Sequence, residues 1–264
     1  MKSKGQNFLI DKNIPAKIVR LAGLGASDGV LEVGPGMGAL TTVLCSTAGF
    51  VTAVEIDARL LPALYEKLDG LTNVEIVRGD ILKLDIGKLL DEKMPGLEYH
   101  VCANLPYGIT TPVLSLFIEA DVFRTITVMI QREVAQRICA KPGKPEYGAF
   151  TVFVNYHTEP EILINVPPEC FHPRPSVYSS VVKMKTRESR VLSQDEEVFF
   201  FKVVRAAFGQ RRKTLVNALN AVFGNSRSKQ DITDIIRECG FDERARGEVL
   251  DVEDFIKLSK LLRC

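Results

Sequence analysis

The sequence predicts an α/β fold followed by a small all-helical domain, and two observations lead to this prediction. First, short apolar runs with strand character alternate with segments of helical spacing between residues 30 and 140. Second, the strand-like runs stop after Thr186, and only helical spacing follows. The alternation is typical of a Rossmann-like, doubly wound and mostly parallel sheet. We therefore expect a sheet-containing domain over residues 1–186 and a helical domain over residues 187–264.

The elements of the first domain follow from hydrophobic spacing. A helix is expected over residues 15–22, opened by Asn13 and ended by Gly23. The expected strands are 30–33, 51–54, 74–77, 99–103 and 126–130, and the expected helices are 39–48, 58–68, 111–119 and 133–140. Two further strands, 151–156 and 179–185, are close enough in sequence to form an antiparallel edge, which gives a sheet of seven strands.

The second domain has four segments of helical spacing, at residues 195–208, 211–223, 229–239 and 252–262. Four phenylalanines in it are expected to form its core rather than to stack on bases, namely Phe199, Phe200, Phe201 and Phe208. Residues 141–148 and 166–175 carry the proline and glycine punctuation of loops.

Composition limits the class of protein. With 264 residues and 46% hydrophobic content, the chain can bury a large core. No apolar stretch approaches the length of a membrane span, and the first residues do not form a signal peptide. We therefore expect a cytoplasmic protein without a membrane partner.

The six cysteines are far apart and form no C-x-x-C pair, and the three histidines show no ligand spacing. This pattern predicts reduced, mostly buried thiols and no metal site.

A glycine-rich turn follows the first strand, in the segment VLEVGPGMGALT of residues 30–42. Gly34, Gly36 and Gly38 allow a sharp turn and a close approach to a ligand at the start of the next helix. Alone, the turn is weak evidence, because proteins that bind nicotinamide cofactors share the spacing when Ala39 is counted.

Carboxylates follow the next two strands. Glu55 ends the second strand, at the distance expected of an acid that binds both ribose hydroxyls. Asp80, followed by Ile81, comes after the third strand and could accept a hydrogen bond from an adenine amine. Each acid alone is more often a helix cap or a solvated residue. Together with the glycine turn and Asn104, however, they fall at successive strand ends, where α/β sheets bind ligands. S-adenosylmethionine accounts for all of them, whereas a dinucleotide accounts only for the turn and Glu55.

The tetrapeptide Asn104-Leu105-Pro106-Tyr107 follows the strand at residues 99–103. An exocyclic amine on adenine is a poor nucleophile, and methylating it requires two acceptors for its hydrogens. The side-chain oxygen of Asn104 and a backbone carbonyl at Leu105 or Pro106 can supply them. Tyr107 offers a face for the base and for the positive charge that develops. The alternative is an ordinary Asn-x-Pro turn.

Basic residues cluster although the net charge is only +1. Residues 198–230 contain seven lysines and arginines and no acid, and the first twenty residues add Lys2, Lys4, Lys12, Lys17 and Arg20 against Asp11. Such clusters suit a polyanion such as RNA. The expected RNA contacts are Arg205, Arg211, Arg212 and Lys213. The alternative, a solvated helix face, usually mixes charges of both signs.

Seven motifs in order give the chain a resemblance to the ribosomal RNA adenine dimethyltransferase family. They are GQNFL (5–9), the glycine turn, VEID (54–57), GDIL (79–82), NLPY (104–107), FHPRPSV (171–177) and FGQRRKTL (208–215). The resemblance covers essentially the whole chain, and the last motif favours the small-subunit branch over the macrolide-resistance branch. The chain has Ser-Val-Tyr at residues 176–178, where the family often has Lys and Asp.

The resemblance implies an S-adenosylmethionine-dependent methyltransferase domain and a helical RNA-binding domain. It implies that Asn7, Leu9, Gly34, Glu55, Asp80 and Asn104 contact the methyl donor, and we expect Gly36 and Ile81 to belong to the same binding site. It further implies that Phe171 stacks on the target adenine opposite Tyr107. It also implies that two adjacent adenosines near the 3′ end of small-subunit (16S) RNA each receive two methyl groups during subunit maturation. The expected partners are this RNA and the immature small subunit, and we expect a monomer.

Three other functions stay open at this point. One is a dimethyltransferase of the macrolide-resistance type, which acts on large-subunit RNA. Another is a binding factor in ribosome assembly for which methylation is secondary. The third is a nicotinamide-dependent oxidoreductase, which the glycine turn alone would permit.

Overall fold

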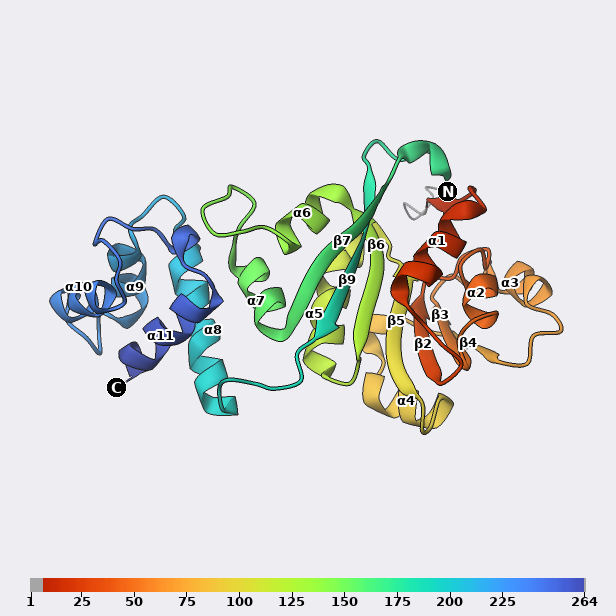
Figure 1. Cartoon of the computed structure of the whole chain (residues 1–264), viewed down its shortest axis with the longest axis horizontal. Coiled ribbons are helices and arrows are strands. Elements are labelled where there is room, and N and C mark those ends of the chain that lie inside the picture. The colour runs from red at the N-terminus through yellow and green to blue at the C-terminus, as the bar shows by residue number, and fades with distance from the viewer. Residues whose placement is uncertain (1–6, 264) are drawn as a thin grey trace. The chain divides into compact units, whose positions relative to one another are not determined.

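The structure is a computed structural model that describes residues 7–263, and it divides into two compact units. The first unit comprises residues up to 135 together with Thr158–Thr186, and the second comprises Gln136–His157 together with the residues from Arg187 onward. Of the predicted features, Lys2, Lys4, Gly5 and Gln6 lie outside the described residues. Figure 1 shows the central sheet of the first unit and the helices of the second.

The first unit is built on a seven-stranded sheet in the order β4-β3-β2-β5-β6-β9-β7. The strands from β4 to β6 are parallel, and β9 pairs antiparallel with both β6 and β7. The bounds are β2 Asp28–Val33, β3 Phe50–Glu55, β4 Val74–Arg78, β5 Glu98–Asn104, β6 Thr125–Gln131, β7 Thr158–Val166 and β9 Ser179–Thr186. This confirms the predicted mostly parallel sheet with an antiparallel edge; the number of strands is the predicted seven, although one of them, β7, lies at other residues than predicted.

Helices of the first unit connect the parallel strands. They are α1 Asn13–Ala22, α2 Thr41–Cys45, α3 Leu61–Lys67, α4 Ile86–Lys93 and α5 Thr110–Ala120, with short 3-10 turns at η1 Ile81–Lys83, η2 Tyr107–Ile109 and η3 Pro168–Cys170. Helix α6, Arg132–Ile138, crosses the boundary between the units. Helix α1 ends as predicted at Gly23, whose φ is 72°. At its start, Asn13 is the first residue of the helix and not its cap; its N–H donates to Asp11 Oδ1 at 2.8 Å.

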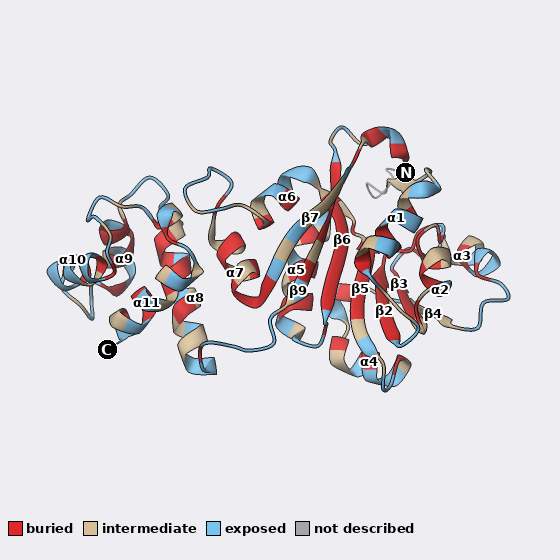
Figure 2. Cartoon of the chain, in the orientation of Figure 1, coloured by how far each residue is buried: buried red, intermediate tan, exposed pale blue. Residues whose placement is uncertain are grey.

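Buried strands make the core of this unit, as Figure 2 shows. Strands β2 and β6 are buried along nearly their whole length, which is typical of parallel strands covered on both faces. One apolar cluster joins α1 and α2 to this sheet through residues such as Ile18, Leu44 and Val30.

The prediction of a strand at residues 151–156 is wrong. These residues belong to helix α7, Ala149–His157, and the edge strand β7 begins directly after it. The β-branched and aromatic run suggests a strand locally, but Val152 and Tyr156 are spaced for one helix face and are buried in the core of the second unit. The Tyr156 and Phe200 ring centroids lie 4.9 Å apart.

The predicted domain division therefore differs from the structure in one segment. Residue 186 does end the first unit, but residues 136–157 cluster with the C-terminal helices instead of the sheet. The four C-terminal helices are α8 Gln194–Gly209, α9 Leu215–Phe223, α10 Lys229–Glu238 and α11 Val252–Arg263, with a 3-10 turn at η4 Gly247–Val249. They match the predicted helices closely. Helix α9 begins later than predicted because Thr214 caps it, accepting from the Asn217 N–H at 3.4 Å.

The aromatic core of the second unit also matches the prediction. Phe200 is fully buried, and Phe199, Phe201 and Phe208 pack against the same cluster. No helix among the described residues is long and apolar enough to cross a membrane.

A buried hydrogen bond tests whether residues 136–157 belong to the second unit. The Tyr147 hydroxyl donates to the Leu250 carbonyl at 2.8 Å. Tyr147→Phe leaves that carbonyl without its donor, and we expect the free energy of unfolding to fall by about 1–3 kcal/mol. Urea denaturation measures the change. Tyr65→Phe is the matched control, because Tyr65 is exposed; equal stabilities for the two variants would contradict the assignment.

Candidate functional site

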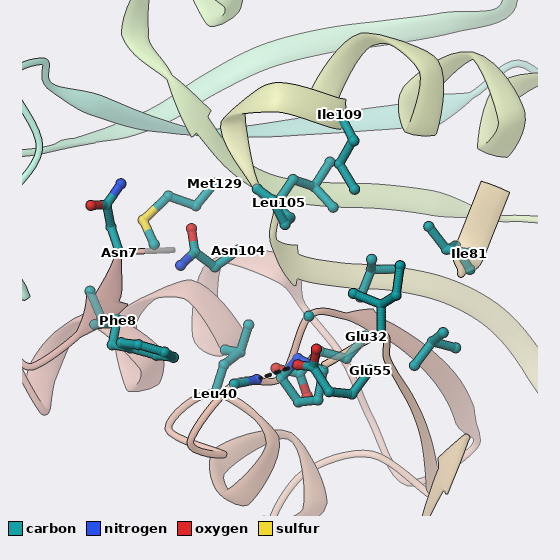
Figure 3. A pocket seen from close by; sticks show the side chains of 18 of the residues that line it. Asn7, Phe8, Glu32, Leu40, Glu55, Ile81, Asn104, Leu105, Ile109 and Met129 are labelled. Atoms are coloured by element: carbon teal, nitrogen blue, oxygen red, sulfur yellow. Dashed lines mark hydrogen bonds between the residues drawn. The ribbon is translucent and has the colours of Figure 1, made fainter. Parts of the chain in front are cut away.

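A cavity opens at the carboxyl ends of the parallel strands. Its wall is formed by residues 7–9, the turn after β2 and the ends of β3, β4 and β5, and it contains about 1070 Å³ of empty space, part of it open to solvent. That space is large enough for a nucleoside-sized ligand. All eight residues predicted to bind the methyl donor line this cavity, namely Asn7, Leu9, Gly34, Gly36, Glu55, Asp80, Ile81 and Asn104. Figure 3 shows the side chains that face it.

The turn after β2 needs its glycines. Gly36 and Gly38 have φ values of 58° and 75°, in the left-handed region that side chains with a Cβ rarely adopt. A Cβ on Gly36 would lie 3.1 Å from Cε1 of Phe8, and one on Gly38 would lie 3.1 Å from Cδ1 of Leu64. The backbone of the turn is therefore free to line the cavity closely.

Glu55 connects the end of β3 to this turn. Its side chain is buried, with Oε2 accepting from the Gly36 N–H at 3.2 Å and Oε1 accepting from the Asp57 N–H at 2.7 Å. Figure 3 draws the first of these bonds. A carboxylate oxygen can accept more than one hydrogen bond, so Glu55 keeps the capacity to bind a pair of hydroxyls.

Asp80 and Ile81 follow β4. Asp80 Oδ1 accepts from the Leu82 N–H at 3.2 Å and so caps η1, which is the structural role that the sequence left open. Asp80 also lines the cavity, next to the buried Ile81. The cap therefore fixes a carboxylate at the cavity wall, and the two interpretations of Asp80 are compatible.

The tetrapeptide after β5 is held in place by the backbone of β6. Asn104 is the last residue of β5 and pairs with Met129, and the Leu105 N–H donates to the Met129 carbonyl at 3.1 Å. The Asn104 side chain faces the cavity near Asn7 and Met129 (Figure 3). The Pro106 carbonyl accepts from the Ile109 N–H and the Thr110 hydroxyl, both at 3.2 Å. Of the two predicted carbonyls, Leu105 is therefore the better candidate for a ligand amine.

Tyr107 also lines the cavity, and its orientation is fixed from outside. The Tyr107 hydroxyl and the Ser179 hydroxyl lie 2.8 Å apart, which ties the ring to strand β9. Four of the five predicted catalytic residues, Asn104 through Tyr107, thus share one wall.

Phe171, the fifth, is not on that wall. It begins the short strand β8, Phe171–His172, which pairs antiparallel with β1, Phe8–Leu9. Successive side chains of a strand point to opposite faces, and here Phe171 is 3% exposed within an apolar cluster while His172 is exposed. The predicted stacking of Phe171 opposite Tyr107 is therefore not the arrangement in this structure. The aromatic side chain of this pair of strands that does line the cavity is Phe8.

Sequence reasoning missed Glu32, which lies in β2 and lines the cavity. The pKa of Glu32 is raised to about 8, chiefly by burial; the nearby Thr41 hydroxyl opposes the shift, and the charge of Glu55 adds to it. Among the described residues, neither Glu32 Oε2 nor Thr41 Oγ1 has a hydrogen-bond partner within bonding geometry. A buried carboxyl with an unpaired oxygen favours a ligand that brings a donor or a positive charge. The signal in the sequence was an acid inside an apolar strand, two residues before Gly34.

The predicted RNA contacts all lie in the second unit. Arg205, together with Lys202, lines a shallow groove formed by α8 and α9. Arg212 and Lys213 are exposed between these helices. Arg211 is different, because its guanidinium donates to the Pro145 and Tyr147 carbonyls at 2.8 and 3.0 Å and so holds the loop before α7.

Comparison with known proteins gives consistent results. The family model described as "Ribosomal RNA adenine dimethylase" matches residues 1–261. The chain is 46% identical over 271 residues to the ribosomal RNA small subunit methyltransferase A of Moorella thermoacetica, covering 99% of this chain and 92% of that protein. It is 44% identical over 262 residues to the protein of the same name from Clostridioides difficile, covering 99% and 90%.

Two solved structures resemble the whole chain. A dimethyladenosine transferase from Plasmodium falciparum has a TM-score of 0.81 and 28% identity, covering 95% of each chain. The 23S rRNA methyltransferase ErmE has a TM-score of 0.77 and 27% identity, covering 98% of this chain and 100% of that chain.

The raised pKa of Glu32 predicts how stability varies with pH. Below its usual pKa of 4.5, Glu32 is protonated in both states; between 4.5 and about 8 only the unfolded state ionises, so its burial costs more stability as pH rises. Glu32→Gln removes this cost, and we expect its advantage over the wild type to grow by about 1.4 kcal/mol for each pH unit in that window. Ligand-free denaturation at pH 5, 6.5 and 8 measures it. If the difference in unfolding free energy between the variant and the wild type does not change with pH, the pKa of Glu32 is not raised in the folded protein.

Proposed function

Because the chain belongs to the ribosomal RNA adenine dimethylase family, we propose that it transfers methyl groups from S-adenosylmethionine to adenine amines of small-subunit ribosomal RNA. The observation that carries the proposal is one cavity wall on which Asn104, Leu105 and Tyr107 adjoin the glycine turn and Glu55. A donor site and an amine-binding site thus share one cavity.

The methyl donor is assigned to the ends of β2, β3 and β4. Glu55 binds the ribose hydroxyls, and Asp80 accepts from the adenine amine beside the apolar Ile81. The backbone at Gly34 and Gly36, together with Asn7 and Leu9, encloses the methionine part. S-adenosylmethionine carries positive charge on its sulfonium and ammonium groups, and this charge would favour the ionised form of Glu32, which burial disfavours in the ligand-free cavity.

The target base is assigned to the end of β5. The Asn104 side-chain oxygen and the Leu105 carbonyl accept the two amine hydrogens and turn the nitrogen lone pair toward the methyl group. A nitrogen–carbon bond then forms as the carbon–sulfur bond breaks, and the amine loses a proton to water. The leaving thioether is neutral, so the residues act by positioning and electrostatics, and the proposal needs no metal.

Tyr107 supplies the aromatic face for the base, oriented by its hydroxyl contact with Ser179. For Phe171 to supply the opposite face, its ring would have to leave the apolar cluster in which it is buried. We therefore propose that Phe171 contacts the target base only if strand β8 changes its conformation when the base binds.

The small-subunit RNA is favoured as substrate by the relatives. The proteins named for the small subunit are 44–46% identical to this chain, whereas the large-subunit enzyme ErmE is 27% identical. We propose two adjacent adenosines near the 3′ end as targets, each dimethylated, in an immature subunit bound by a cytoplasmic monomer. A role in assembly with secondary methylation would instead leave binding to immature subunits intact in an inactive Glu55→Ala variant.

RNA binding is assigned to Arg205, Arg212 and Lys213, whose charges are exposed. Arg211 is removed from the set of primary contacts, because two carbonyls of the loop at residues 145–147 already occupy its guanidinium.

Asn104→Ala tests the function directly. We expect transfer of labelled methyl groups to immature small subunits to fall by about 10²–10³-fold, since the variant lacks one preorganised acceptor for the reacting amine. RNA affinity and melting temperature should stay at wild-type values. In the wild-type reaction, the label should map to two adjacent adenosines of small-subunit RNA. Full activity in the variant, or a wild-type reaction that leaves those two adenosines unlabelled, would contradict the proposal.

Salt dependence tests the RNA-binding residues. Replacing Arg212 and Lys213 together by Gln should lower the slope of log affinity against log salt by about 0.7–0.9 for each phosphate that the variant no longer neutralises. Lys88 and Lys93 of α4, replaced by Gln, give a control with the same change in net charge. Equal slopes for the two double variants would place the RNA elsewhere.

A further inference from the structure

Three ionisable side chains meet near the amino ends of the parallel strands, whereas the cavity lies at their carboxyl ends. They are Asp28, which begins β2, and Glu98 and His100 of β5, and each offers an atom within 4.8 Å of the other two. None of them takes part in the proposed reaction. From Glu98 to Asn104 the strand spans about 20 Å, so this cluster is remote from the amine-binding wall.

Strand register explains why the three side chains converge. Strands β2 and β5 are parallel neighbours, with Asp28 opposite Glu98. Glu98 and His100 are two residues apart on one strand and therefore point to the same face. Strand pairing thus places two carboxylates, of Asp28 and Glu98, and the imidazole of His100 on one face of the sheet.

His100 has a buried nitrogen without a partner. The residue is 7% exposed, and Nε2 has no hydrogen-bond partner among the described residues. Its nearest acid, Asp28 Oδ1, is 3.7 Å away, which is too long for a hydrogen bond. The other ring nitrogen, Nδ1, lies 2.8 Å from the Thr125 hydroxyl at the start of β6. A proton on Nδ1 satisfies this contact and leaves the Nε2 lone pair directed at the cluster.

We propose that Asp28, Glu98 and His100 bind a divalent cation of the zinc class. An imidazole nitrogen with carboxylate oxygens is a ligand set that zinc and its neighbours accept. A separation of 3.7 Å between Nε2 and Asp28 Oδ1 is near that of two ligands sharing one ion at about 2.0–2.2 Å each. Glu98 is exposed and would bind the ion from the solvent side of the site. Water molecules would supply the remaining ligands.

The surroundings support this assignment. Thr125 would orient the imidazole, and the Gly25 N–H and the Ser27 hydroxyl donate to Asp28 at 2.8 and 3.2 Å, as outer groups do around metal ligands. Burial lowers the pKa of the His100 imidazole, and the carboxylates of Asp28 and Glu98 oppose this shift.

Two cations limit the affinity. Arg124 Nε lies 4.0 Å from Glu98 Oε2, and Lys183, whose Nζ donates to the Ala22 carbonyl, also lowers the pKa of His100. The ion must displace Arg124 from Glu98, which is possible because that contact is at the limit of an ion pair. The bound ion would join the amino ends of β2 and β5 and, through Thr125, of β6.

Zinc titration of the purified full chain tests the proposal. We expect calorimetry to show one zinc ion per chain and a raised melting temperature. Glu98→Gln, an exposed and structurally mild change, should weaken zinc binding at least tenfold, and Thr125→Val should weaken it by about 10–100-fold. Glu119→Gln, an exposed acid at the end of α5, is the matched control and should bind zinc like the wild type.

Cobalt distinguishes this site from the cysteines. Bound Co²⁺ should give visible ligand-field absorption without the near-ultraviolet charge-transfer band of a thiolate. No stoichiometric binding by the wild type, a thiolate band, or equal affinities of Glu98→Gln and Glu119→Gln would each overturn the proposal.

Discussion

The register of the parallel strands is the constraint on which the rest of this structure depends. Hydrogen bonds between β4, β3, β2, β5 and β6 bring all five carboxyl ends to one edge and all five amino ends to the other. At the first edge they bring together the glycine turn, Glu55, Asp80 and Asn104, which are far apart in the chain. At the second edge they bring Asp28 beside Glu98. A shift of one residue in β5 would turn both Asn104 and His100 to the other face of the sheet.

Hydrogen bonds from backbone N–H groups to Glu55 connect two loops of the cavity wall. Glu55 accepts from two N–H groups, one in the turn after β2 and one after β3, so that a single carboxylate determines the relative position of two loops. The neighbouring Glu32 is buried, its Oε2 has no hydrogen-bond partner among the described residues, and burial raises its pKa. The carboxylate assigned to the ribose is thus held by hydrogen bonds, whereas the one assigned to the positive charge keeps an oxygen without a partner among the described residues.

Local sequence patterns predicted an element correctly where its tertiary contacts favour the same secondary structure as its own residues do. The buried strands, the glycine turn and the acids at strand ends could be predicted because each carries its own pattern of apolar or turn-forming residues. Residues 151–156 could not, because strand-like composition was overruled by burial of Val152 and Tyr156 against distant helices. Phe171 depended on its pairing with β1, and Arg211 on two carbonyls more than 60 residues away in the chain. Asp28 and His100 have no recognisable spacing, since only strand register relates them.

The second unit is built from two separate segments of the chain, which limits how chimeras with homologues can be made. The backbone passes from one unit to the other three times, after residues 135, 157 and 186. The C-terminal helices are therefore not an independent appendage, because α7 is inserted from within the sheet-forming sequence and completes their core. A chimera that exchanges everything after residue 186 with a homologue would place a foreign helical bundle on the native α7. Exchanging RNA specificity between relatives thus requires that residues 136–157 and the residues after 186 are taken from the same protein. Because Tyr156 and Phe200 pack against each other, substitutions at these two positions should covary among homologues.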